Sequence, residues 1–119
     1  MIRVVHLFDL KKGVGEKGFL EWLDAKLGTA ARQFGCEDRK TWVLLDGFTG
    51  SYAQPRAVHD RPRYVNEAYW RDREGPQKFR EWLTGTAEGK EIHERWFSSI
   101  QNHTVLRYIE GWGATDPDE

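Results

Sequence analysis

The chain has 119 residues and a formal net charge of −1, enough for one domain with a real core and no electrostatic basis for binding nucleic acid or an anionic membrane. Its one cysteine, Cys36, excludes an internal disulfide framework. No segment is apolar for long enough to span a membrane, and the N-terminus is too charged for a signal peptide, so we expect a cytoplasmic protein.

The first half of the sequence predicts a strand, a helix and a second strand. Residues 2–8 (IRVVHLF) are β-branched or aromatic and form the first strand. The helix is predicted over residues 16–34, because its apolar side chains recur at intervals of three and four. Gly35 stands where a left-handed helix C-cap is expected, and residues 40–45 form the second strand.

The second half predicts the same order of elements. Residues 63–70 (RYVNEAYW) form a strand, and Pro76 suits the first turn of the helix that follows. That helix breaks near residues 84–89 (TGTAEG), a further helix covers residues 90–100, and residues 104–109 form the last strand.

Two pairs of short segments also match between the halves. GFLEWL (18–23) resembles KFREWL (78–83), and WVLLDGF (42–48) resembles LRYIEGW (106–112). Matching strand–helix–strand units indicate an α+β fold with the order βαββαβ. This is a ferredoxin-like four-stranded antiparallel sheet with its helices on one face.

The domain organisation follows from this repeat. We predict a single domain over residues 1–113, with pseudo-repeat halves 1–47 and 63–112. The acidic residues 114–119 form a solvated tail. The connection 48–62 is longer than a hairpin needs. It has two interpretations: a disordered surface loop, or an arm that reaches a partner subunit or covers a pocket.

The strands predict a homodimer because they are apolar on both faces. In the first strand Val5 and Leu7 lie opposite the alternate set, which comprises Ile2, Val4, His6 and Phe8. Helices cover one face of the sheet, and no other element is left for the second. We expect two subunits to pair sheet to sheet as a dimeric α/β barrel.

Candidate catalytic residues lie on the two central strands. Asn66 and Trp70 point to one face of their strand with the small Ala68 between them, which leaves a hollow with polar rims. His6 occupies the matching position of the first half and would be a proton acceptor if its pKa were near neutrality. The alternative is structural: a satisfied amide, a core indole and a buried histidine.

The helix at 90–100 adds candidates for substrate binding. His93 and Trp96 lie on one side of it, where packing alone is the simpler explanation. We expect His59 and His103 to be surface groups. The histidines and acidic residues lack zinc-ligand spacing, so we predict no metal site, and no glycine-rich loop suggests a nucleotide.

These features resemble the antibiotic biosynthesis monooxygenase-like family of the dimeric α/β-barrel superfamily. The resemblance rests on the strand that ends in Trp70, the FREWL helix and the histidine about ten residues further on. It implies a cofactor-independent monooxygenase that oxidises a polyphenolic aromatic molecule with O2. Asn66 would then hold the phenol or enolate oxygen, and Trp70 would confine the flat substrate.

The haem-degrading branch of the family offers an alternative. There a tryptophan at the end of the third strand and a helical histidine that ligates iron match Trp70 and His93. His6 stands where that branch has an asparagine, which puts its mechanism in doubt. A third reading keeps the fold as a non-catalytic ligand-binding or stress-related dimer.

Overall fold

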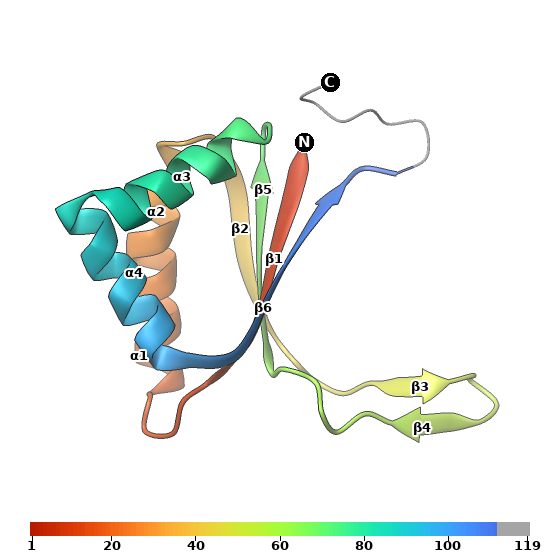
Figure 1. The fold of residues 1–119 in the computed structure, drawn as a ribbon. Helices are drawn as coiled ribbons and strands as arrows, with labels where there is room; N and C mark the ends of the chain where they lie inside the picture. The colour runs from red at the N-terminus through yellow and green to blue at the C-terminus, as the bar shows by residue number, and fades with distance from the viewer. Residues whose placement is uncertain (112–119) are drawn as a thin grey trace.

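The computed structural model describes residues 1–111, so the predicted tail at 114–119 and the last residue of the second half lie outside the described residues. A four-stranded antiparallel sheet with the order β2-β5-β1-β6 carries the helices on one face (Figure 1). Its strands are β1 (Ile2–Leu10), β2 (Cys36–Val43), β5 (Tyr64–Trp70) and β6 (Ile100–Ile109). The ferredoxin-like fold is thus confirmed.

The first helical segment is continuous but changes pitch. It comprises α1 (Glu16–Trp22), a π-helical turn η1 (Leu23–Leu27) and α2 (Gly28–Arg32). The chain then leaves the helix through Gly35, whose φ of +96° is the left-handed conformation that glycine adopts without cost. The predicted glycine cap is confirmed.

The second helical segment is a pair. Helix α3 (Glu74–Gly85) contains Pro76 in its first turn, and α4 (Ala87–Ser99) follows after one residue, Thr86. The Thr86 hydroxyl accepts a hydrogen bond from the Gly89 N–H at 2.9 Å, as a helix N-cap should. The predicted break is therefore real, and α4 begins three residues earlier than expected.

The two edge strands also begin earlier than the sequence predicts. Strand β2 starts at Cys36 rather than residue 40, with a register shift between Cys36 and Asp38. Strand β6 starts at Ile100 rather than residue 104, although Asn102 has a φ of +54°. Both early segments are polar, so hydrophobic alternation does not mark them. Arg39 of the first segment nevertheless lines the cavity between the sheet and the helices, and His103 of the second lies beside His6.

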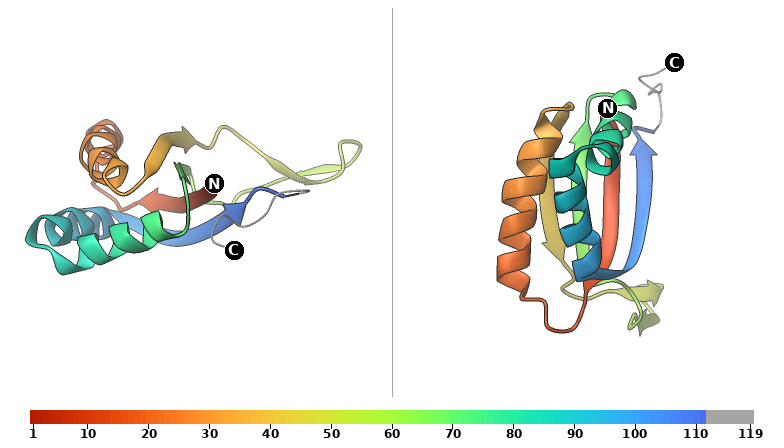
Figure 2. Two further views of the ribbon diagram at one scale, coloured as in Figure 1. Left: turned by 90° about the horizontal axis from the view of Figure 1, so that it is seen from above. Right: turned by 60° about the vertical axis from the view of Figure 1, so that its left-hand side comes forward.

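The connection 48–62 forms a β-hairpin. Strands β3 (Phe48–Gly50) and β4 (Pro55–Ala57) pair with each other and not with the main sheet. The hairpin extends well beyond the end of the sheet, on the side away from the helices (Figures 1 and 2). The segment is therefore an ordered hairpin and not an irregular loop, and its contact with a partner subunit or a pocket stays a prediction.

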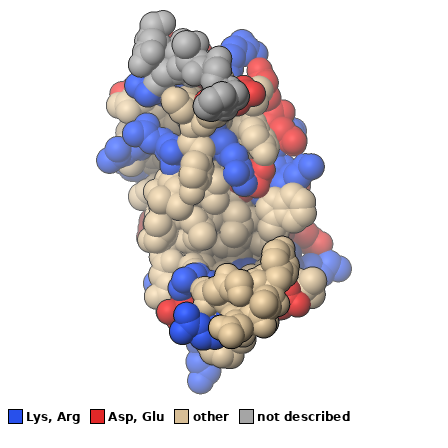
Figure 3. All heavy atoms as spheres, turned by 90° about the vertical axis from the view of Figure 1, so that its right-hand side faces the viewer, with Lys and Arg blue, Asp and Glu red and all other residues tan. Residues whose placement is uncertain are grey.

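The two faces of the sheet differ in their cover. The helix-facing side holds the core, which includes Ile2, Val4 and Phe8 from β1. The other side carries exposed apolar residues, among them Trp42 and Leu106, and it has no covering element in the described chain. Figure 3 shows this face as a broad area without Lys, Arg, Asp or Glu, bordered by charged groups.

Candidate functional site

A cavity of about 510 Å³ lies between the sheet and the helices, within the range of small-molecule pockets. All of the predicted site residues line it: His6, Asn66, Ala68, Trp70, His93 and Trp96. Strand pairing places His6 directly opposite Asn66, and Thr41 of β2 on the other side of Asn66. The structure therefore brings these residues, from two strands and one helix, together at one cavity.

Asn66 is held in one orientation by two neighbours on β2. The Arg39 guanidinium Nη2 donates to the Asn66 Oδ1 at 2.5 Å, and the Asn66 Nδ2 donates to the Thr41 Oγ1 at 2.8 Å. A guanidinium has no acceptor, so the amide oxygen must be the atom that faces Arg39. One N–H of the buried Asn66 amide is left without a partner in the described chain. Asn66 is thus both structurally bonded and able to donate once more.

His6 is part of a histidine pair. Its Nδ1 lies 2.9 Å from the Nε2 of His103, and the two rings are nearly parallel. The Trp96 ring packs against His6 with 4.8 Å between centroids. Burial, helped by His103 and Arg39, lowers the pKa of His6 to about 3. His6 is therefore neutral at neutral pH, and its pKa is far from the near-neutral value that the sequence interpretation required.

His103 was expected to be a surface group, and this was wrong. It is only partly exposed, and burial lowers its pKa as well. A hydrogen bond between two neutral imidazoles needs one donor and one acceptor. When His6 donates through Nδ1, its Nε2 keeps a lone pair, which is the form that a proton acceptor needs.

The aromatic wall of the cavity comes from Trp70, Trp96 and the phenylalanines beside them. Trp70 packs against Phe79 with 5.6 Å between ring centroids, and Phe97 lies 5.0 Å from Trp96. The indole N–H groups of Trp70 and Trp96 are buried and have no hydrogen-bond partner in the described chain. These rings supply flat apolar surface, which suits a planar ligand.

His93 lies on α4 at the cavity, with its ring 4.5 Å from the ring of Phe97. No hydrogen bond engages its imidazole within residues 1–111, which leaves both ring nitrogens available to a ligand. Among the described residues no group of three or more His, Cys, Asp or Glu side chains could hold a metal ion by itself.

The sequence interpretation missed the cationic part of the site. Arg39, Arg80 and Arg107 line the cavity, from β2, α3 and β6 respectively. Arg39 was overlooked because it lies one residue before the predicted second strand. An earlier strand start would have put it opposite Ala68, beside the Asn66 position, where the register now places it.

Comparisons with known proteins support the fold. No protein family and no curated protein matches this sequence. Solved structures do match over nearly the whole chain. Hydroxynitrile lyase from Passiflora edulis has a TM-score of 0.60 at 16% identity, and the match covers 96% of each chain. A dimeric ferredoxin-like protein of unknown function from Thermobifida fusca has a TM-score of 0.57 at 12% identity, covering 90% of this chain and 88% of the other.

A third structure is that of a MhuD mutant with two manganese protoporphyrin IX molecules bound per active site. It has a TM-score of 0.56 at 16% identity, covering 97% of this chain and 99% of the other. These proteins differ in what they bind or do, so the likeness leaves the reaction open. The chain has the ferredoxin-like fold of these proteins.

Proposed function

We propose that this chain is a homodimeric, cofactor-independent monooxygenase that oxidises a planar polyphenolic or related aromatic molecule with O2. The observation that carries the proposal is the Asn66 amide, fixed by Arg39 and Thr41, in an aromatic-walled cavity beside His6 and Trp70. Asn66 and Trp70 are also the residues that match the asparagine and tryptophan of the monooxygenases that the sequence resembles.

In the proposed reaction His6 removes a proton from a ring carbon that lies between two aromatic rings. The resulting carbanion shares its charge with a phenol oxygen, and the free N–H of Asn66 donates to that oxygen. The carbanion passes one electron to O2, and the two radicals combine to a peroxide. Loss of water leaves a carbonyl, so a CH2 group and O2 become C=O and H2O without an outside reductant.

The low pKa of His6 makes it a weak base before proton transfer begins. Proton transfer creates an enolate oxygen opposite the new imidazolium, and their attraction offsets part of the cost of charging a buried ring. The positive charge of Arg39 helps to keep the pKa of His6 low, and the developing anion offsets that charge. The pKa of His6 therefore rises as the enolate forms.

The direct test is oxygen uptake with an anthrone-type phenolic substrate. Asn66→Ala should lower turnover by about ten- to a thousandfold, the range for one lost oriented donor. Gln101→Ala, which removes an exposed amide from β6, should leave it unchanged. Unchanged uptake in Asn66→Ala would remove Asn66 from the mechanism. Binding without any oxygen uptake in the parent would instead favour a non-catalytic ligand-binding protein.

Haem binding is a second candidate, favoured by the position of His93. His93, an imidazole without a hydrogen bond at an aromatic cavity, would ligate the haem iron, and the lining arginines would pair with the propionates. Haem would supply its own redox chemistry, and His93 would hold it. Titration with haemin should give a saturating Soret shift that His93→Ala abolishes. A flat titration would end this candidate without affecting the first.

We propose the homodimer because the open sheet face is mostly apolar and its buried carboxylate is already satisfied. Glu67 accepts hydrogen bonds from Arg3 at 2.8 Å and from the Tyr69 hydroxyl. Burial raises the pKa of Glu67, but these hydrogen bonds outweigh it and the pKa lies below its usual value. A second sheet can therefore cover this face without leaving a carboxylate unpaired.

The compartment is part of the same proposal. Cys36 is a buried free thiol, which suits the reducing cytoplasm. None of the helices within residues 1–111 has the length and apolar character needed to cross a membrane.

A further inference from the structure

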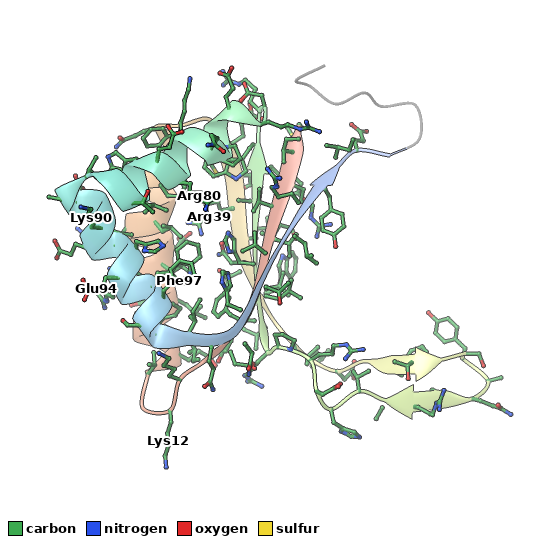
Figure 4. All side chains as sticks on the ribbon, in the orientation of Figure 1. Lys12, Arg39, Arg80, Lys90, Glu94 and Phe97 are labelled. Atoms are coloured by element: carbon green, nitrogen blue, oxygen red, sulfur yellow. The ribbon has the colours of Figure 1, made fainter. Side chains whose placement is uncertain are left out.

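The charge of the cavity carries information about the class of ligand that goes beyond the proposed monooxygenase chemistry. The lining contains three arginines and no aspartate or glutamate. Figure 4 shows Arg39 and Arg80 between helix α3 and the sheet, while the exposed Glu94 lies on the outer side of α4. The lining histidines add no negative charge. The cavity therefore presents positive charge from three different elements.

Arg39 lacks a counter-ion. Its guanidinium donates to two neutral acceptors, the Asn66 Oδ1 at 2.5 Å and the Leu23 carbonyl oxygen at 3.5 Å. It forms no ion pair with a carboxylate of residues 1–111, and burial lowers its pKa, partly opposed by Cys36 and Asp24 acting through space. A partly buried charge without an ion-pair partner is costly, and an anionic ligand would relieve that cost.

The other two arginines are exposed and lie at the cavity lining. Neither Arg80 nor Arg107 forms an ion pair with a carboxylate in the described part of the chain. Cations at a cavity raise the local concentration of anions and speed their entry. Arg39 would then bind the anion inside the cavity, while the exposed Arg80 and Arg107 would attract it from the solvent.

From these contacts we infer that the cavity selects an aromatic ligand that carries a carboxylate, with Arg39 as its anchor. A carboxylate arrives ionised at neutral pH, whereas a phenol does not. Two carboxylate oxygens also match the fork of a guanidinium. Trp70, Phe79 and Trp96 would contact the flat ring system. This inference rests on the proposed function, because both place an aromatic ligand in the same cavity.

The test compares two probes of the same shape, anthracene-2-carboxylate and anthracene-2-carboxamide, by calorimetry and by quenching of tryptophan fluorescence. The acid should bind about 10- to 100-fold more tightly than the amide, as expected for charge-assisted hydrogen bonds. Arg39→Gln should reduce this preference to less than about threefold. Arg56→Gln, which removes an exposed arginine from the distant hairpin, should keep it.

Circular dichroism establishes whether Arg39→Gln is folded. If it is not, Arg80→Gln at the exposed lining should still lower the preference, by about two- to fivefold. Equal binding of acid and amide, or a preference that persists in a folded Arg39→Gln, would overturn the inference. If a neutral phenolic substrate still supports oxygen uptake in that case, only the inference fails. If neither probe binds and no uptake occurs, the proposed function fails as well.

Discussion

Protonation of His6 gives the sharpest prediction, because burial beside His103 and Arg39 sets the direction of its pKa shift. The ordinary pKa of histidine is 6.5, and that of His6 in the folded chain is about 3. Between pH 6.5 and about pH 3, His6 is protonated in the unfolded chain and neutral in the folded chain. Folding stability is therefore fully present above pH 6.5 and is lost as the pH falls toward 3.

Over most of this pH range the loss of folding stability depends only on the protonation of His6 in the unfolded chain. Lowering the pH from 7 to 4.5 should cost about 2.5 kcal/mol, at nearly 1.4 kcal/mol per pH unit once the unfolded histidine is protonated. At pH 4.5 His6 is still neutral in the folded chain, because its pKa is about 3.

The assay is urea unfolding at a series of pH values for the parent and for His6→Gln. Glutamine does not titrate and can keep a hydrogen bond to His103. Subtracting the two curves removes the contributions of other groups, such as Glu67. The difference should grow by about 2.5 kcal/mol between pH 7 and pH 4.5. A flat difference would refute the reasoning, because His6 would then accept a proton in the folded chain.

Two further predictions concern packing and assembly. Gly75→Ala should destabilise the fold by about 1–3 kcal/mol, because its Cβ would lie 2.5 Å from a backbone carbonyl oxygen and 2.9 Å from the Trp70 ring. Gly85→Ala meets nothing within 4 Å and should be neutral or slightly stabilising; equal effects in thermal unfolding would contradict the close approach. Leu106→Lys, on the open sheet face, should yield monomers by light scattering at micromolar concentration. Gln33→Lys near the helices should remain dimeric, and a monomeric parent would reject the dimer itself.

The helices and central strands could be predicted because their patterns are strong and local. The interval of three and four in residues 16–34 and the apolar run at residues 2–8 both reflect burial against one core. The pairing of His6 with Asn66 followed from the topology alone. Once the repeat indicated βαββαβ, the first and third strands had to be neighbours.

Arg39 and His103 could not be predicted as site residues because they lie where the edge strands depart from alternation. The segment before residue 40 reads CEDR, which resembles a polar turn, and the register shift after Cys36 hides the strand. His103 follows Asn102, whose positive φ interrupts the strand pattern. The pairing of β1 with β6 also shifts register between Leu7 and Asp9, close to His103.

The hairpin has a hydrodynamic consequence. It contributes to dimensions of 50 × 45 × 18 Å and a radius of gyration of 16.0 Å, whereas a compact chain of this length would have about 13.5 Å. A gel-filtration column calibrated with spherical standards would consequently return an inflated mass even for one subunit. An early elution peak would thus mimic a dimer, and the mass should be taken from scattered intensity rather than from elution volume.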